Sequence, residues 1–339
     1  MQERLSLEAL AALPTVAALN ISHSGDQVAF YADWTGHFEL YTLDLATRER
    51  RQVTDGQAPK AVRAGFVWSA DDSRLLFSRD HNGDERQALF DLNLASGDVS
   101  VLQHAPQSMD YAVDAHPDGQ RLLVNSTRGG QMNVHVYNLS KEGEASWTAL
   151  TTLPNATQAA AWSPDGAWLT LTTNKSTDLR NTDGYVMNAD GSGLRRILRV
   201  REGSQDSVGE WHPDGKRVAA SSDADGTHRV GLLTVETGEV QWLTPQQEGI
   251  EEDMGRFSPD GRWLSAIRNM DSTTDARALR HGDRKGAYAE IAARPGTGNA
   301  IHPRRQDAVS VHHVHDPAGS AAVQSRRRHL RGALARRVR

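Results

Sequence analysis

The sequence predicts an all-β protein, a β-propeller built from blades of four antiparallel strands. Two observations carry this prediction: a short turn motif recurs at almost constant spacing, and each copy is followed by the same order of short strands. Repeats of this length that each contain four strands are typical of propellers. A helical solenoid would show apolar residues with a period of 3.6, whereas the apolar residues here alternate. A β-sandwich is the alternative, because regular short strands alone do not separate the two folds.

The turn motif is an aromatic residue followed by Ser-Pro-Asp-Gly in its most complete form. Pro fixes φ and Gly accepts a positive φ, so the motif fits a tight turn. Its last position recurs at residues 25, 72, 119, 166, 215 and 261, at intervals of 47, 47, 47, 49 and 46 residues. His116 and His212 take the Ser position in two copies and are expected to cap the turn. The expected anchor residues of the turns are Gly25, Asp72, Asp118, Gly119, Asp165, Gly166, Asp214, Gly215, Asp260 and Gly261.

Each copy of the turn motif is followed by the same run of elements. In the second repeat, the apolar run Leu75–Phe77 comes directly after the turn, and the alternating segment Leu89–Leu94 forms the next strand. A second turn, Ser96–Gly97, then leads to a short fourth strand. Such alternation over short segments is typical of half-buried strands. The sixth repeat departs from this order after Trp263 and Leu264, so we expect about six recognisable blades, the last one incomplete.

These patterns divide the chain into three segments. Residues 1–19 form an N-terminal helical segment, in which Leu5–Leu13 is predicted to be a short helix because its leucines share a face and Pro14 stops it. Residues 20–271 form the β-propeller. Residues 272–339 form an aberrant tail rich in Arg, His and Ala.

The tail differs from the propeller in charge and in pattern. From Arg277 onward it holds 13 Arg and one Lys against four acidic residues, although the whole chain has a net charge of -5. An out-of-frame reading of a GC-rich gene yields mainly Arg, Ala, Gly, Pro and His. A seventh turn is expected about one repeat beyond residue 261. When permissible codons are chosen for residues 300–307 and read one base later, they encode Gln-Phe-Thr-Pro-Asp-Gly-Lys, which contains the turn motif close to that place. We therefore expect the tail to be translated in a shifted frame and to be disordered.

The composition excludes several kinds of protein and site. The longest nearly unbroken apolar stretch, Ala9–Leu19, contains Pro14 and is shorter than the roughly 20 residues of a membrane span. With no Cys, disulfides, thiolate metal sites and cysteine nucleophiles are excluded, and a reducing, cytoplasmic setting fits. The tail contains a His-rich run at 311–316 and an Arg run at 326–328. Because neither has a fold to position it, we expect no metal, no cofactor and no nucleic acid to bind.

The turn motif with its following apolar pair resembles the repeats of TolB-like propellers and of the N-terminal propeller of the prolyl oligopeptidase family of serine peptidases. Two segments favour the peptidase family. Leu7–Val16 looks like the start of acylaminoacyl-peptidase-type members, and Arg79–Gln87 is similar to an Asp-x-x-Gly-Asp-Glu segment common in them. The matching residues of the second segment are Arg79, Asp80, Gly83, Asp84 and Glu85. The resemblance covers about residues 4–271.

This resemblance implies a two-domain enzyme, in which a propeller restricts access to short peptides and an α/β-hydrolase domain carries a Ser-Asp-His triad. Such a hydrolase needs a Gly-x-Ser-x-Gly pentapeptide, because a strained turn must present the Ser hydroxyl beside its oxyanion donors. The chain contains no such pentapeptide, so no catalytic residue is assigned and the chain alone is expected to be inactive. In the intact relative, its partners would be short peptides and the missing hydrolase domain. The alternative is a free-standing TolB-like propeller that binds protein partners.

A candidate substrate site lies before the sixth turn. Relatives such as dipeptidyl peptidase IV hold a substrate amine with a glutamate pair, which charge-assisted hydrogen bonds make possible. Glu251 and Glu252, in what we expect to be an inter-blade loop, could form such a pair, and a solvated acidic loop without chemistry is the competing interpretation. Arg79, Asp80 and Glu85 are expected to fix the shape of their own loop.

Overall fold

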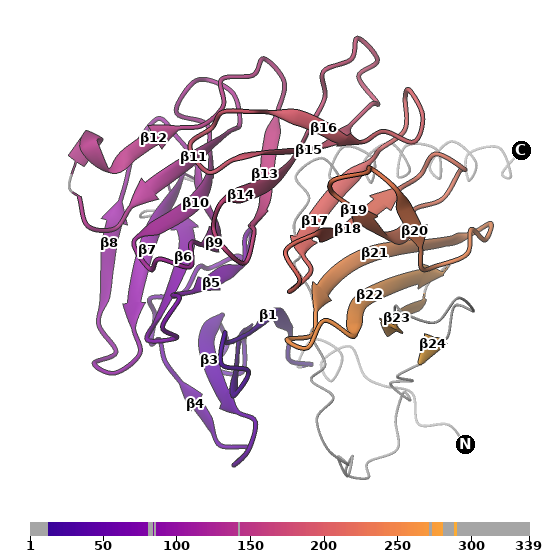
Figure 1. Cartoon of the computed structure of the whole chain (residues 1–339). Helices are drawn as coiled ribbons and strands as arrows, with labels where there is room; N and C mark the ends of the chain where they lie inside the picture. The colour runs from indigo at the N-terminus through magenta and orange to yellow at the C-terminus, as the bar shows by residue number, and fades with distance from the viewer. Residues whose placement is uncertain are drawn as a thin grey trace, which may run out of the picture.

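The computed structural model describes residues 13–80, 84, 86–141, 143–270, 273–280 and 288–289. Within them, six antiparallel sheets of four strands follow one another around a ring (Figure 1). The predicted all-β propeller with four-stranded blades is thereby confirmed. The described residues contain one short 3-10 helix, η1 (Gly143–Ser146), and no helix that is long and apolar enough to cross a membrane. The predicted helix Leu5–Leu13 lies outside the described residues, apart from Leu13.

The strands of each blade pair in chain order, so that every blade is a meander of hairpins. Blade 1 consists of β1 (Val16–Ile21), β2 (Gln27–Ala32), β3 (Glu39–Asp44) and β4 (Arg50–Gln52). Blade 2 consists of β5 (Phe66–Trp68), β6 (Arg74–Asp80), β7 (Gln87–Asn93) and β8 (Val99–Gln103). Blade 3 consists of β9 (Asp110–Ala115), β10 (Arg121–Ser126), β11 (Asn133–Asn138) and β12 (Trp147–Ala149). Blade 4 consists of β13 (Thr157–Trp162), β14 (Trp168–Thr173), β15 (Asp183–Asn188) and β16 (Arg195–Leu198). Blade 5 consists of β17 (Ser207–Trp211), β18 (Arg217–Ser222), β19 (Arg229–Thr234) and β20 (Val240–Trp242). Blade 6 consists of β21 (Ile250–Phe257), β22 (Trp263–Met270), β23 (Thr273–Arg280) and β24 (Tyr288–Ala289).

The sixth blade extends beyond residue 271, where we placed the end of the propeller. β23 pairs with β22 along its whole length, and the two-residue β24 adds a fourth strand. The expectation of an incomplete last blade is therefore wrong in the number of strands. The physical reason lies in β23, where Arg277 and Leu279 are buried and the alternate Ala276 and Ala278 are only partly buried. This alternation is sufficient for a strand, because the ladder itself is made by backbone groups.

The anchor turns have a left-handed backbone conformation at their last position. In blades 3 to 6 the anchor glycines have φ between 67° and 70°, a region in which L side chains are strained. In blade 2 the position is taken by Asp72, with φ of 58°. Asp tolerates this region better than most residues, and here its carboxylate accepts hydrogen bonds from the backbone N–H groups of His23 and Ser24 in blade 1. The turn therefore also links two blades.

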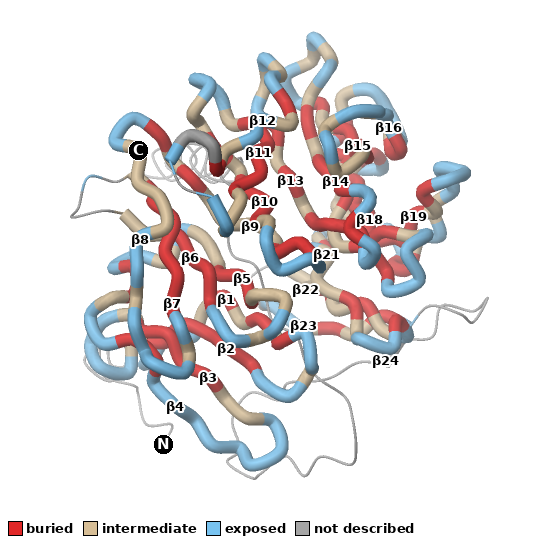
Figure 2. Tube along the Cα trace, turned by 60° about the vertical axis from the view of Figure 1, so that its left-hand side comes forward, coloured by how far each residue is buried: buried red, intermediate tan, exposed pale blue. Residues whose placement is uncertain are grey.

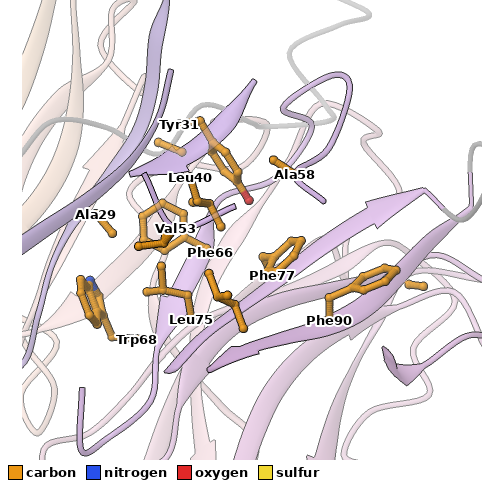
Figure 3. Close-up of a cluster of buried hydrophobic side chains, with 13 residues drawn as sticks. Ala29, Tyr31, Leu40, Val53, Ala58, Phe66, Trp68, Leu75, Phe77 and Phe90 are labelled. Atoms are coloured by element: carbon orange, nitrogen blue, oxygen red, sulfur yellow. The ribbon is translucent and has the colours of Figure 1, made fainter. Parts of the chain in front are cut away.

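Hydrophobic clusters join each blade to the next. Between blades 1 and 2, Tyr31 and Leu40 from the first blade meet Phe66, Trp68 and Phe77 from the second (Figure 3). Equivalent clusters join blade 2 to 3, 3 to 4, 4 to 5 and 5 to 6. Figure 2 shows the buried segments in the bodies of the blades and exposed residues at the turns. The central strands are buried on both faces because each face packs on a neighbouring blade, which explains their nearly continuous apolar sequences.

Candidate functional site

The first strands of the blades surround a common axis. β1, β5, β9, β13, β17 and β21 contact one another in this order, as each blade follows the last around the ring (Figure 1). Their side chains are thus the ones that approach the axis. In an assembly of this shape, a ligand or substrate that moves along the axis must pass these strands, so we take them as the candidate site.

Bulges interrupt most of these inner strands near their ends. In β17 the pairing with β18 jumps from Val208 to Trp211, and in β21 the pairing with β22 jumps from Met254 to Phe257. In β9 the shift lies at Val113. A bulge twists the strand and re-aims a side chain. Glu210 and Arg256 lie inside two of these bulges.

Three charged side chains of the inner strands interact electrostatically, and we call Asp114, Glu210 and Arg256 the axial cluster. They belong to β9, β17 and β21, hence to blades 3, 5 and 6. Glu210 Oε1 lies 3.6 Å from Arg256 Nη1. Asp114 interacts electrostatically with both Arg256 and Glu210. Blade 4 stands between blades 3 and 5, so this electrostatic coupling links charges on blades that are not neighbours in the ring.

The two acids of the axial cluster also connect neighbouring blades. Asp114 Oδ2 accepts a hydrogen bond of 2.8 Å from the backbone N–H of Trp162, in blade 4. Glu210 Oε2 accepts one of 2.9 Å from the backbone N–H of Phe257, in blade 6. Asp114 and Glu210 occupy the same position of their repeats, two residues before the anchor histidine. Alignment of the repeats shows that this position is charged in three of the six copies, as Asp114, Glu210 and Arg256, a signal that was missed in the sequence.

Burial raises the pKa of Asp114 to about 6. The hydrogen bond from Trp162 and the positive charge of Arg256 favour the ionised form, while the negative charge of Glu210 disfavours it. Asp114 therefore changes its charge close to neutral pH, which is typical of carboxylates in functional sites and of buried structural ones alike. Chemically, the axial cluster can bind and orient charged groups and exchange a proton at Asp114, but it contains no nucleophile.

The glutamate pair proposed as a substrate site lies in strand β21 and not in a loop. Successive side chains on a strand point to opposite faces of the sheet, so the carboxylates of Glu251 and Glu252 do not converge. Glu252 is 2% exposed, and its Oε1 accepts hydrogen bonds of 2.8 Å from both Arg268 Nε and Arg277 Nη1. Glu251 Oε2 accepts a bond of 2.6 Å from the backbone N–H of His228. Both carboxylates are engaged within the protein, and their binding of a substrate amine stays a prediction.

The segment that resembles the peptidase family joins blade 2 to the chain before it. Arg79, in β6, donates a hydrogen bond of 2.5 Å to the backbone oxygen of Gln57, and its guanidinium lies 4.3 Å from the ring centroid of Phe90. Asp80 ends the same strand. Asp84 pairs with His104 at 3.1 Å. Gly83 and Glu85 lie outside the described residues, as does the His- and Arg-rich run of the tail.

The histidines of the anchor turns hold the next turn along the ring. His116 Nε2 donates to the backbone oxygen of Gly166 at 3.0 Å, and His212 Nε2 does the same to Gly261 at 2.9 Å. Their Nδ1 atoms accept from the backbone N–H groups of Asp118 and Asp214 in their own turns. Each of the two imidazole side chains thus links its own blade to another blade of the propeller. In the part of the chain that the structure describes, no group of three or more His, Asp or Glu residues is placed to hold a metal ion.

Solved structures share this fold. An oligogalacturonate lyase in complex with manganese aligns with a TM-score of 0.64 and 17% identity over 85% of this chain and 81% of its own. A structure from a study of two prolyl endopeptidases aligns with a TM-score of 0.62 and 16% identity over 84% of this chain but 43% of its own. TolB from Acinetobacter baumannii aligns with a TM-score of 0.57 and 17% identity over 83% of this chain and 65% of its own. At these identities the likeness concerns the fold alone.

The sequence has no match among curated proteins. It does match the profile of the prolyl oligopeptidase N-terminal beta-propeller domain over residues 8–257. The match begins before the first blade and ends at the last residue of β21. It therefore spans well over half of the chain and five complete blades. On this basis the chain belongs to the family of N-terminal β-propeller domains of prolyl oligopeptidases.

Proposed function

We propose that this chain is the non-catalytic propeller of a serine peptidase of the acylaminoacyl-peptidase type, which admits short peptides to a hydrolase domain. The family match supports the propeller role, and the lack of a Gly-x-Ser-x-Gly pentapeptide accounts for the absence of a nucleophile from this sequence. Catalysis would then reside in the hydrolase domain, through a Ser nucleophile, a His base and an oxyanion hole.

The axial cluster is the observation that carries the gating role. Charged side chains of inner strands in three blades interact electrostatically, and two of them are also hydrogen-bonded to a neighbouring blade. A long or folded polypeptide on this path would have to separate Glu210 from Arg256 and break the inter-blade bonds at the same time. Groups in one hydrogen-bonded network are costly to separate. A short peptide has far less bulk to accommodate, so the propeller would select by size.

The test is to join the propeller to the hydrolase domain that its gene is expected to encode downstream. We would compare kcat/KM for an acylated tripeptide and for an unstructured peptide of about 40 residues that carries the same scissile bond. The joined enzyme is expected to favour the short substrate by at least about tenfold, a difference of about 1.4 kcal/mol in the activation free energy, whereas the hydrolase domain alone shows no such preference. Equal preference in the two enzymes would refute gating by the propeller.

The matched variants address the axial cluster itself. Arg256→Ala removes the only cation of the cluster, and Arg262→Ala removes an exposed Arg of the neighbouring anchor turn that pairs locally with Asp260. Arg256→Ala is expected to raise kcat/KM for the long peptide and leave that for the tripeptide unchanged. Arg262→Ala is expected to change neither. Equal effects of the two variants would show that the cluster does not restrict the path.

The second candidate is a free-standing binding module, which the fold shared with TolB favours. DNA downstream of codon 339 distinguishes the two: an encoded Gly-x-Ser-x-Gly supports the peptidase, and its absence supports the binding module. We also propose a cytoplasmic location, since a chain without Cys has no need of an oxidising compartment. Recovery of the protein from the periplasm after cell fractionation would contradict this location and favour the TolB-like role.

A further inference from the structure

The outermost strand of each blade has one free edge. Among the residues that the structure describes, the fourth strand of every blade pairs with the third strand only, so its other edge carries unpaired backbone N–H and C=O groups. Such an edge is a template for pairing with another chain. Proteins protect it by keeping the strand short or by placing charged side chains on it.

β8 is the outer strand with the least protection. It is five residues long and contains no charged residue. The outer strands of the other five blades are two to four residues long within the described chain, and β4 and β16 contain two arginines each. In β12 and β20 an arginine guanidinium lies over the tryptophan of the strand, 3.8 and 3.9 Å from the ring centroid. Val101 of β8 is 51% exposed, and Figure 1 shows this strand on the outer rim of the ring.

Two residues of β8 direct their backbone groups to the free edge. The N–H of Asn93 donates a hydrogen bond of 2.9 Å to the backbone oxygen of Asp98, so Asp98 bonds toward β7. In an antiparallel ladder, successive residues bond alternately to the two sides. Ser100, two residues further on, therefore also bonds toward β7. The N–H and C=O groups of Val99 and Val101 consequently face the free edge.

A β-bulge ends the regular part of this edge. The residues opposite Val101 and Gln103 are adjacent on β7, so Leu102 is the extra residue. Its backbone oxygen accepts a hydrogen bond of 2.9 Å from the Tyr137 hydroxyl in blade 3. Because a bulge bends the strand that contains it, a partner strand can follow β8 in regular pairing only from Asp98 to Val101.

We propose that β8 pairs with β8 of a second copy of this chain, antiparallel and across a two-fold axis at Ser100. In this register, Val99 of each copy lies opposite Val101 of the other. The backbone groups that face the free edge then form two hydrogen-bonded pairs, each exchanging both of its N–H···O bonds. The two valine pairs also cover the exposed Val101 side chains, since β-branched residues directly opposite each other stabilise a sheet.

A second copy suits this edge because the strand is complementary to itself. The strand has no charge, so no like charges oppose each other across the axis. Antiparallel pairing also brings the Asp98 end of each strand to the His104 end of the other, which places an acid near an imidazole twice. A two-fold interface uses the same surface on both copies and closes at the dimer.

The dimer is expected to be weak and concentration-dependent. One short pair of strands buries less than the roughly 1,200 Å² at which stable interfaces begin. We therefore expect a Kd of about 10 to 100 µM, within the range between the micromolar and millimolar limits. The proposal is independent of the peptidase role proposed above, because it concerns the rim of the ring and uses no residue of the axial cluster.

A single introduced cysteine tests the register, since the chain contains no Cys. Ser100→Cys would face its own copy in a non-hydrogen-bonded pair, whose Cα atoms are about 4.5 Å apart, a distance that a disulfide spans. Thr148→Cys, at the exposed centre of the outer strand β12, is the matched control. Under mild oxidation, Ser100→Cys is expected to form a covalent dimer at least about tenfold faster than Thr148→Cys. Equal rates would overturn the proposal.

Sedimentation of the full chain tests the equilibrium. Between about 2 and 200 µM, the wild type should shift reversibly from monomer to dimer around the expected Kd. Val101→Lys places a charge on the paired edge and is expected to weaken dimerisation at least about tenfold. Leu179→Lys makes the same type of change at a residue of blade 4 that is 88% exposed, and should leave the Kd unchanged. A monomer throughout the range, equal weakening by both variants, or assembly beyond the dimer would each refute the pairing.

Discussion

Replacement of Asp114 by Asn is expected to stabilise the propeller at neutral pH. Burial raises the pKa of Asp114 to about 6 in the folded chain, against an ordinary value of 3.8. A group whose pKa is higher in the folded state contributes stability that is fully present below pH 4 and is lost as the pH rises through 6. The difference of about two pKa units corresponds to about 3 kcal/mol. Because the side chain keeps some contact with solvent, we expect about 1 to 3 kcal/mol.

The assay is urea unfolding of the wild type and of Asp114→Asn between pH 4 and 8. Asn is neutral, and its Oδ1 can still accept the hydrogen bond from Trp162. The difference in unfolding free energy should be small near pH 4 and should grow in favour of Asn until about pH 7. A difference that does not change with pH, or an Asn variant that is less stable at pH 7, would refute the reasoning.

Asp260→Asn serves as a control with the opposite sign. Hydrogen bonds from the Ser258 hydroxyl and from the backbone N–H of Arg262 lower the pKa of Asp260 to about 2. Its contribution is present above pH 4 and is lost as the pH falls through 2. Asp260→Asn is therefore expected to be less stable than the wild type at pH 7.

Four further predictions follow from the structure and the sequence. A Cβ at Gly166 would lie 2.3 Å from His116 Nε2, whereas a Cβ at Gly25 meets nothing within 4 Å. In urea unfolding, Gly166→Ala should therefore lower the free energy of unfolding by about 2 kcal/mol more than Gly25→Ala does. Equal losses in the two variants would contradict the bridging role of His116. Glu252→Gln should destabilise the chain by about 3 kcal/mol, because the buried Arg277 and the partly buried Arg268 lose their counter-charge, while Glu251→Gln should cost less than about 1 kcal/mol. A serine-directed fluorophosphonate should leave the purified chain unlabelled, and stoichiometric labelling would reveal a nucleophile. Far-UV circular dichroism of the chain shortened to about residue 280 should be dominated by β-structure, and a helical spectrum would contradict the fold.

The repeats could be predicted from the sequence because their signals are local. A Pro-Asp-Gly turn is specified by the φ preferences of its own residues, and a strand of alternating or continuous apolar residues is recognisable without its partners. The even spacing of the anchors then implies a propeller, since each unit of four strands needs a neighbour on either face to bury its apolar residues. The end of the propeller was placed too early because the anchor pattern, and not strand pairing, defined it.

The candidate site could not be predicted in the same way. Glu251 and Glu252 look like a solvated acidic pair in the sequence, but β21 directs them to opposite faces and gives them separate partners. Asp114 and Glu210 share a position of the repeat that is acidic in two of the six copies, and only the tertiary structure shows that this position lies on the innermost strand.

By itself, then, the sequence determined the fold class, the number of repeats and the turn chemistry, all of which depend on residues within one repeat. The tertiary structure decided which charges meet, because Asp114, Glu210 and Arg256 come from blades 3, 5 and 6 and their separations depend on how the blades close around the axis. It also decided which apolar faces of the described blades are shared, because a blade presents apolar residues on both faces and only the ring brings the faces of two blades together.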